Sequence, residues 1–276
     1  MTIVSNSECG RNALSSDQQD NQPAEQQPKI PEGEIAERPI AEEPVVEKQR
    51  REPIFNIPGI LVIFVLVMTA IHILRTYFLS PDADATLLDW MAFTPQRYLY
   101  PLDKQDLGWL IGPVGYSLLH GGWLHLLFNC VWMIAFASSL VLRIGTLRFV
   151  LLWIASAVAS AFFQAFATGF ADSMLIGASG VVSATVGAAC RFSLQFSGSP
   201  AMRYAQYAPR LGIFEALTHR PIIVFILMWA LSNALVVYGA GLPSGSENYH
   251  IAWQAHVGGF LFGYLLFDLF DRPPRR

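Results

Sequence analysis

The chain has 276 residues, of which 53% are hydrophobic and 14% are charged, and its formal net charge is −3. A soluble domain of this size would carry about 25% charged residues. The composition therefore argues against a soluble globular protein and favours a membrane protein.

Residues 1–55 differ from the rest of the chain. They are polar and proline-rich, almost lack aromatics, and contain eleven acidic residues against six Lys and Arg. Such a segment cannot bury enough apolar surface to offset its chain entropy. We expect a disordered, acidic cytoplasmic tail over 1–55 and a membrane domain over 56–276. The acidity of the tail also argues against a mitochondrial transit peptide.

Apolar runs of about 20 residues, the length that crosses a bilayer, recur after the tail. We predict an all-α fold with six membrane-spanning helices, at about 57–79, 122–142, 147–168, 178–194, 220–241 and 250–270. Lys and Arg flank the ends of these runs that would share the side of the N-terminus. By the positive-inside rule, both termini are cytoplasmic. The predicted second, fourth and sixth spans then all start on the outer side, beneath a loop over 241–250 that is a candidate lid.

The fourth span begins with Gly177-Ala178-Ser179-Gly180. The first backbone N–H groups of a helix lack partners within the helix, and its dipole favours negative charge there. The amides near Ser179 and Gly180 therefore form a candidate oxyanion site beside a candidate nucleophile. Gly177 would let a substrate backbone approach closely. Taken alone, Ser179 is better explained as an N-cap, which serine makes well.

The sixth span contains His256, and an ionisable residue inside a span is costly and usually functional. Gly259 and Gly263 form a small-xxx-small face on the same helix. The fourth span has its own small face from Ser179 onward. Two such faces can pack at close range, which would bring Ser179 and His256 together.

The second span carries His120, His125 and Asn129. His125 and Asn129 lie four residues apart and share a helix face, whereas His120 falls in the entry loop. We expect Asn129 to donate to a developing oxyanion, with His125 assisting. A structural role is the alternative for each, and for His120 we favour it.

The predicted spans contain no Asp or Glu before Asp268, at the cytoplasmic end of the sixth. A Ser-His-Asp triad therefore lacks an obvious third member. The pattern favours a dyad of Ser179 and His256, with the histidine oriented by packing. No P-loop or metal-ligand spacing occurs, so we expect no nucleotide, nucleic acid, cofactor or metal.

Together, the motifs of 120–129, 177–180 and 255–263 resemble those of the rhomboid family of intramembrane serine proteases. The resemblance covers roughly residues 57–270. It implies a rhomboid-like bundle with Ser179 as nucleophile and His256 as general base, and with His125, Asn129 and the Ser179 amide around the oxyanion. It also implies cleavage of transmembrane proteins near the outer face of a bilayer, without cofactor or metal. The compact six-span plan fits a bacterial inner membrane.

Two features depart from the family pattern. Many relatives carry an aromatic residue four positions after the serine, where it stacks on the histidine, but this chain has Ser183. Many also have a Trp-Arg pair in the first loop, and this loop offers Arg97 without such a pair.

Two other functions share parts of the pattern. A catalytically silent relative that binds membrane clients would usually lack the serine or the histidine, and both are present. A polytopic transporter would place carboxylates near the membrane midplane, where the predicted spans have none.

Overall fold

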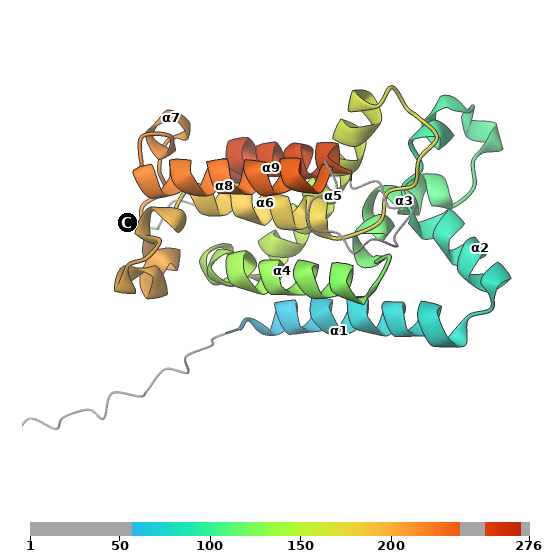
Figure 1. Ribbon diagram of the computed structural model, residues 1–276, viewed down its shortest axis with the longest axis horizontal. Helices are drawn as coiled ribbons and strands as arrows, with labels where there is room; N and C mark the ends of the chain where they lie inside the picture. Colours follow the sequence, from blue (N-terminus) through green and yellow to red (C-terminus); the bar gives the residue numbers. More distant parts are fainter. Residues whose placement is uncertain (1–56, 238–251, 272–276) are drawn as a thin grey trace, which may run out of the picture. The chain divides into compact units, whose positions relative to one another are not determined.

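The computed structural model describes residues 57–237 and 252–271, and within these ranges every regular element is a helix (Figure 1). The α-helices are α1 (Gly59–Ile73), α2 (Pro81–Met91), α3 (Gly108–Gly115), α4 (Trp123–Ile144), α5 (Thr146–Ala167), α6 (Ser179–Cys190), α7 (Ile213–Ala216), α8 (Arg220–Val237) and α9 (Trp253–Leu266). A π-helical turn (Leu74–Phe78) extends α1, and 3-10 helices occupy Pro95–Leu99, Leu102–Lys104, Tyr116–Leu118, Leu194–Phe196, Pro200–Tyr207 and Phe267–Leu269. The predicted all-α class is thus confirmed for this part of the chain. The predicted tail over 1–55 and the candidate lid over 241–250 lie outside the described residues.

Three of the described helices are long and apolar enough to cross a membrane: Gly59–Phe78, α4 and α5. The chain also has apolar helices at the other three predicted positions, but α6 has 12 residues and α9 has 14. At 1.5 Å per residue these two rise only about 18–21 Å, less than the ~30 Å hydrocarbon core of a bilayer. The six-span topology therefore remains a prediction.

The shortest of these helices, α6, lies in the middle of the bundle, beside α4, α5 and α9 (Figure 1). Every residue of α6 after Ser179 is buried. A Cβ atom added at Gly259 would overlap the carbonyl oxygen of Gly180, and one at Gly263 would overlap that of Ala184. The backbones of α6 and α9 therefore touch, as membrane helices do when small residues line their contact.

Charged residues gather at the end of α6 opposite Ser179. Arg191 pairs with Asp268 at 2.9 Å, and Arg210 reaches the same carboxylate at 3.1 Å. Beside them, Arg143 pairs with the buried carboxylate of Asp271 at 2.8 Å. The one acid that the sequence placed inside a predicted span is thus held by two guanidinium groups.

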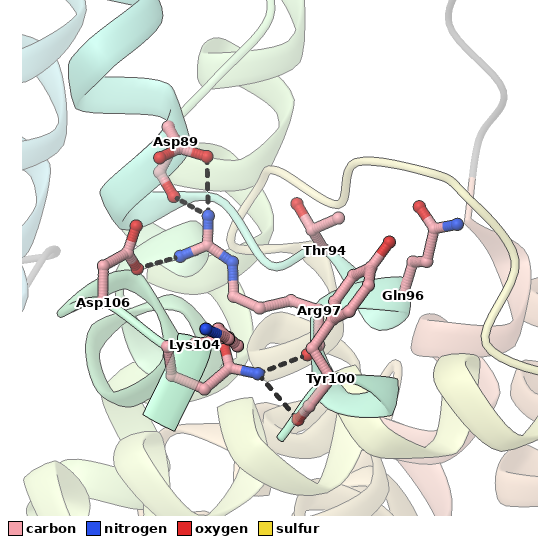
Figure 2. Close-up of a pocket in the computed structure, with 8 residues that line it drawn as sticks. Asp89, Thr94, Gln96, Arg97, Tyr100, Lys104 and Asp106 are labelled. Atoms are coloured by element: carbon pink, nitrogen blue, oxygen red, sulfur yellow. Dashed lines mark hydrogen bonds and ion pairs between the residues drawn. The ribbon is translucent and has the colours of Figure 1, made fainter. Parts of the chain in front are cut away.

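The first loop is organised around Arg97 (Figure 2). Its guanidinium donates to the carboxylates of Asp89 at 2.6 Å and Asp106 at 2.5 Å. The Gln105 side chain donates to the Arg97 carbonyl at 2.7 Å. A polar cavity of about 310 Å³ opens here, and all its lining residues fall within 89–106. Arg97 therefore ties Asp89, Gln105 and Asp106 of this loop together.

The same loop is joined to the segment that leads into α6. Phe93 and Leu175 exchange backbone hydrogen bonds, with N–H to O distances of 3.2 and 2.9 Å, and both side chains are buried. The Gly177 N–H donates to the carbonyl of Tyr116 at 2.9 Å. These bonds fix the approach of the chain to Ser179.

Candidate active site

Ser179 and His256 meet although 77 positions separate them. Ser179 is the first residue of α6, and His256 is near the start of α9. The Ser179 Oγ lies 2.8 Å from the His256 Nε2. The N-cap position of α6 is taken by Ala178, so Ser179 is the first helical residue and not the cap. The pair has the hydrogen-bonded geometry of a nucleophile and its base.

The other ring nitrogen of His256 contacts a residue that the sequence analysis missed. His256 Nδ1 lies 2.6 Å from the Oδ1 of Asn233, on α8. Asn233 Nδ2 in turn donates to the carbonyl of Trp229 at 2.8 Å. The available signal was Asn233 itself, the one side-chain amide in the mostly apolar run 220–241.

Backbone N–H groups gather beside the serine hydroxyl. The Val182 N–H donates to the carbonyl of Ala178 at 2.8 Å. The amides of Ser179 and Gly180 precede this bond and belong to the first turn, whose N–H groups have no intrahelical partner. The same end of α6 is the positive end of the helix dipole. This arrangement can stabilise an oxyanion that forms next to Ser179.

Gly177 accommodates the ring of His125. Its φ of +120° is strained for any residue with a side chain, and an added Cβ would lie 2.7 Å from two ring atoms of His125. The same Cβ would lie 3.7 Å from the Ser179 Oγ. The imidazole of His125 and the serine hydroxyl therefore flank one glycine.

Asn129 is buried on α4, one turn after His125. Its Nδ2 donates to the His125 carbonyl at 2.8 Å. A side-chain amide carries two N–H groups, so this bond uses one of them. Asn129 is thus fixed to its own helix while retaining a second donor.

His120 lies outside α4 and is 1% exposed. Its ring centroid is 5.1 Å from that of His125, and its carbonyl accepts a hydrogen bond from Arg75 at 3.1 Å. Burial, helped by repulsion from His125 and His72, lowers the pKa of His120 to about 3. His120 is therefore neutral near pH 7, which agrees with a structural role.

No carboxylate takes the position that Asn233 occupies. Asp268 is twelve residues beyond His256, about 18 Å along the chain at helical rise, and is paired with Arg191. Within 57–237 and 252–271, no three His, Cys, Asp or Glu residues are placed to hold a metal ion. Among the described residues, the groups gathered at Ser179 are the His256 imidazole, the Asn233 amide beyond it and the backbone donors of α6.

Comparison with known proteins matches residues 109–272 to the family model described as "Rhomboid domain". The chain is also similar to proteins named "Rhomboid protease GlpG". It is 27% identical over 209 residues to the one from Serratia proteamaculans (strain 568), which covers 75% of this chain and 60% of that protein. It is 28% identical over 211 residues to those of Yersinia pestis (strain Pestoides F) and Yersinia pseudotuberculosis serotype O:3 (strain YPIII), covering 75% of this chain and 62% of each.

The chain thus spans about three-fifths of the length of these relatives. The match to the family model nevertheless extends over more than half of the chain and includes Ser179, His256 and Asn233. With the apolar helices, it identifies a multi-pass membrane protein. The chain belongs to the rhomboid family.

Proposed function

We propose that the chain is an intramembrane serine endopeptidase in which Ser179 is the nucleophile and His256 the general base. The observation that carries this proposal is the 2.8 Å contact between Ser179 Oγ and His256 Nε2, at a helix start inside a helical bundle. The chain's membership of the rhomboid family supports the same activity, and so does the name of its relatives, "Rhomboid protease GlpG".

In the proposed reaction, His256 takes the hydroxyl proton as the oxygen of Ser179 attacks the scissile carbonyl carbon. The carbonyl oxygen becomes an oxyanion and accepts hydrogen bonds from the amides at the start of α6. The protonated histidine then gives its proton to the leaving nitrogen as the C–N bond breaks, which leaves an acyl ester on the serine. Water, deprotonated by the same histidine, hydrolyses this ester and restores the hydroxyl.

We propose transmembrane segments of other proteins as the substrates. The membrane domain over 56–276 would hold them beside six spans, with both termini cytoplasmic and Ser179 toward the outer face. A substrate must leave its helix to reach Ser179, and each backbone group unsatisfied in lipid costs several kcal/mol. Segments with Gly or Pro near the cleaved bond should therefore be preferred.

A fluorophosphonate probe tests the proposed activity without a known substrate, because it reacts only with an activated serine. The wild-type chain should be labelled at Ser179, and Ser179→Ala should not. An unlabelled but folded wild type would favour the silent client-binding protein. Labelling that survives Ser179→Ala would place the reactive serine elsewhere.

Asn129→Ala is expected to slow labelling and cleavage by about 10²–10³-fold, the effect of losing one oxyanion donor. Activity should remain because the amides of Ser179 and Gly180 are unchanged. Two quantities are measured for each variant: the cleavage rate at saturating substrate and the midpoint of thermal unfolding. His125→Ala should fall between Asn129→Ala and the serine variant, and His120→Ala should act mainly by lowering the midpoint.

Ser138→Ala is the matched control for Asn129→Ala. Ser138 also lies on α4, and its hydroxyl donates to the Ile134 carbonyl at 2.5 Å, just as Asn129 donates to the His125 carbonyl. The control loses a similar helix bond at a position nine residues from Asn129. Equal losses in the two variants would rule out a donor role for Asn129.

A further inference from the structure

We propose that Asn233 is a positioning residue that fixes the tautomer and orientation of His256, so that the site is a Ser179–His256–Asn233 triad. The inference rests on the proposed function. It starts from the 2.6 Å contact between His256 Nδ1 and Asn233 Oδ1, which joins α9 to α8.

The hydrogen-bond pattern permits a single direction of donation along this chain of groups. The Trp229 carbonyl can only accept, so the Asn233 NH2 faces it at 2.8 Å. The amide oxygen is then left for His256 and can also only accept, which requires a proton on Nδ1. In the neutral ring the Nε2 lone pair therefore faces the Ser179 Oγ, as a general base requires.

An amide in this position carries a specific risk. If it flipped, its NH2 would donate to Nδ1 and enforce the wrong tautomer. The bond from Asn233 to Trp229 opposes this flip, because a flipped amide would turn its oxygen toward another oxygen. Trp229 thus anchors the orientation of Asn233 through the helix backbone.

A second contact sets the register of the two helices. The rings of Trp229 and Phe260 stack at 4.7 Å between centroids, with 25° between their planes. Trp229 precedes Asn233 by four residues, and Phe260 follows His256 by four. The Trp229–Phe260 stack and the Asn233–His256 hydrogen bond therefore lie one helical turn apart between antiparallel helices. The stack fixes the register that brings Asn233 and His256 together.

Asn233 also explains how His256 is held although position 183 has no aromatic residue. Ser183 is 5% exposed and offers no ring to stack on the histidine. A neutral acceptor on α8 orients the ring without the cost of a carboxylate inside an apolar helix.

The test compares Asn233→Leu, which removes the acceptor at similar size, with Asn233→Asp, which keeps an oxygen for the Nδ1 proton. Ser232→Ala is the matched control, because Ser232 is exposed on the same turn and donates to the same Trp229 carbonyl at 2.7 Å. Asn233→Leu should slow fluorophosphonate labelling about 10–100-fold, part of the 10²–10⁴ that a positioned base contributes. Asn233→Asp should recover part of the rate, because it restores an acceptor for Nδ1 but loses the donor to the Trp229 carbonyl. Ser232→Ala should match the wild type.

The readout specific to positioning is the ¹⁵N spectrum of histidine-labelled protein, with the His256 signals assigned by their loss in His256→Ala. The wild type and Asn233→Asp should show a proton on Nδ1 and a bare Nε2, and Asn233→Leu should lose this single state. A wild-type His256 protonated on Nε2 would overturn the inference, even if Asn233→Leu does not fold. Labelling of Asn233→Leu at the wild-type rate would overturn it too, whereas an unlabelled wild type would refute the proposed function instead.

Discussion

Ser179→Ala and His256→Ala should each reduce turnover by about 10⁴-fold or more. The hydroxyl supplies the attacking oxygen, and the imidazole 2.8 Å away receives its proton. Because the two groups act as a unit, either loss removes the same step, and the double variant should be no worse than a single one. Single-turnover rates on a transmembrane peptide, measured for the three variants at equal folded concentration, check this result.

Ser183→Ala provides the matched control for the nucleophile. Ser183 is buried one turn further along α6, so Ser183→Ala also removes a serine hydroxyl from this helix but leaves the Ser179 hydroxyl in place. It should leave turnover close to that of the wild type. Cleavage that persists in Ser179→Ala, or a fully active His256→Ala, would contradict the assigned roles. Losses that multiply in the double variant would show that the residues act independently.

The juxtaposition of Ser179 and His256 could be predicted because each is a polar group at the start of an apolar run. The glycines around them predict a close approach, because two helices with small residues at their contact can pack closely enough to bring their first turns together. Both pieces of information are local in the sequence, and the resemblance to the rhomboid family is carried by the same residues.

Asn233 could not be predicted in the same way. An amide in the middle of an apolar run has several ways to satisfy its donors, including a bond to its own helix, as Asn129 forms with the His125 carbonyl. Its contact with His256 depends on the register between α8 and α9. That register follows from packing, notably the stack of Trp229 on Phe260, and no motif in the sequence specifies it.

The hydropathy of the sequence also could not predict where the short helices end. The fourth predicted span extends to residue 194, but α6 ends at Cys190. The next residue, Arg191, donates to the carbonyls of Leu211 and Tyr264 at 2.9 and 2.7 Å. These contacts reach across the bundle, so the apolar run that continues past Arg191 in the sequence does not continue as part of the α-helix.

Gly263→Ala is expected to destabilise the bundle by about 1–3 kcal/mol, the usual cost of overpacking, and Gly263→Val by more. A Cβ at this position of α9 would overlap the carbonyl of Ala184 on α6, so the two helices would have to separate. Intrinsic helix propensity predicts the opposite sign, since Ala favours a helix over Gly by about 1 kcal/mol. The contact with backbone decides between them, because a carbonyl inside a helix cannot move aside as a flexible side chain can.

Gly59→Ala is the control that separates the effect of helix propensity from that of packing. Gly59 lies on α1, and a Cβ added there meets no atom within 4 Å. Gly59→Ala should leave the thermal midpoint unchanged or slightly raised, while Gly263→Ala lowers it and also slows labelling of Ser179. The second effect follows because Gly263 is seven residues from His256, about 10 Å along α9. A helix displaced at Gly263 should therefore shift the histidine from the serine without touching either side chain. Equal midpoints for the two alanine variants would show that α6 and α9 are not in backbone contact.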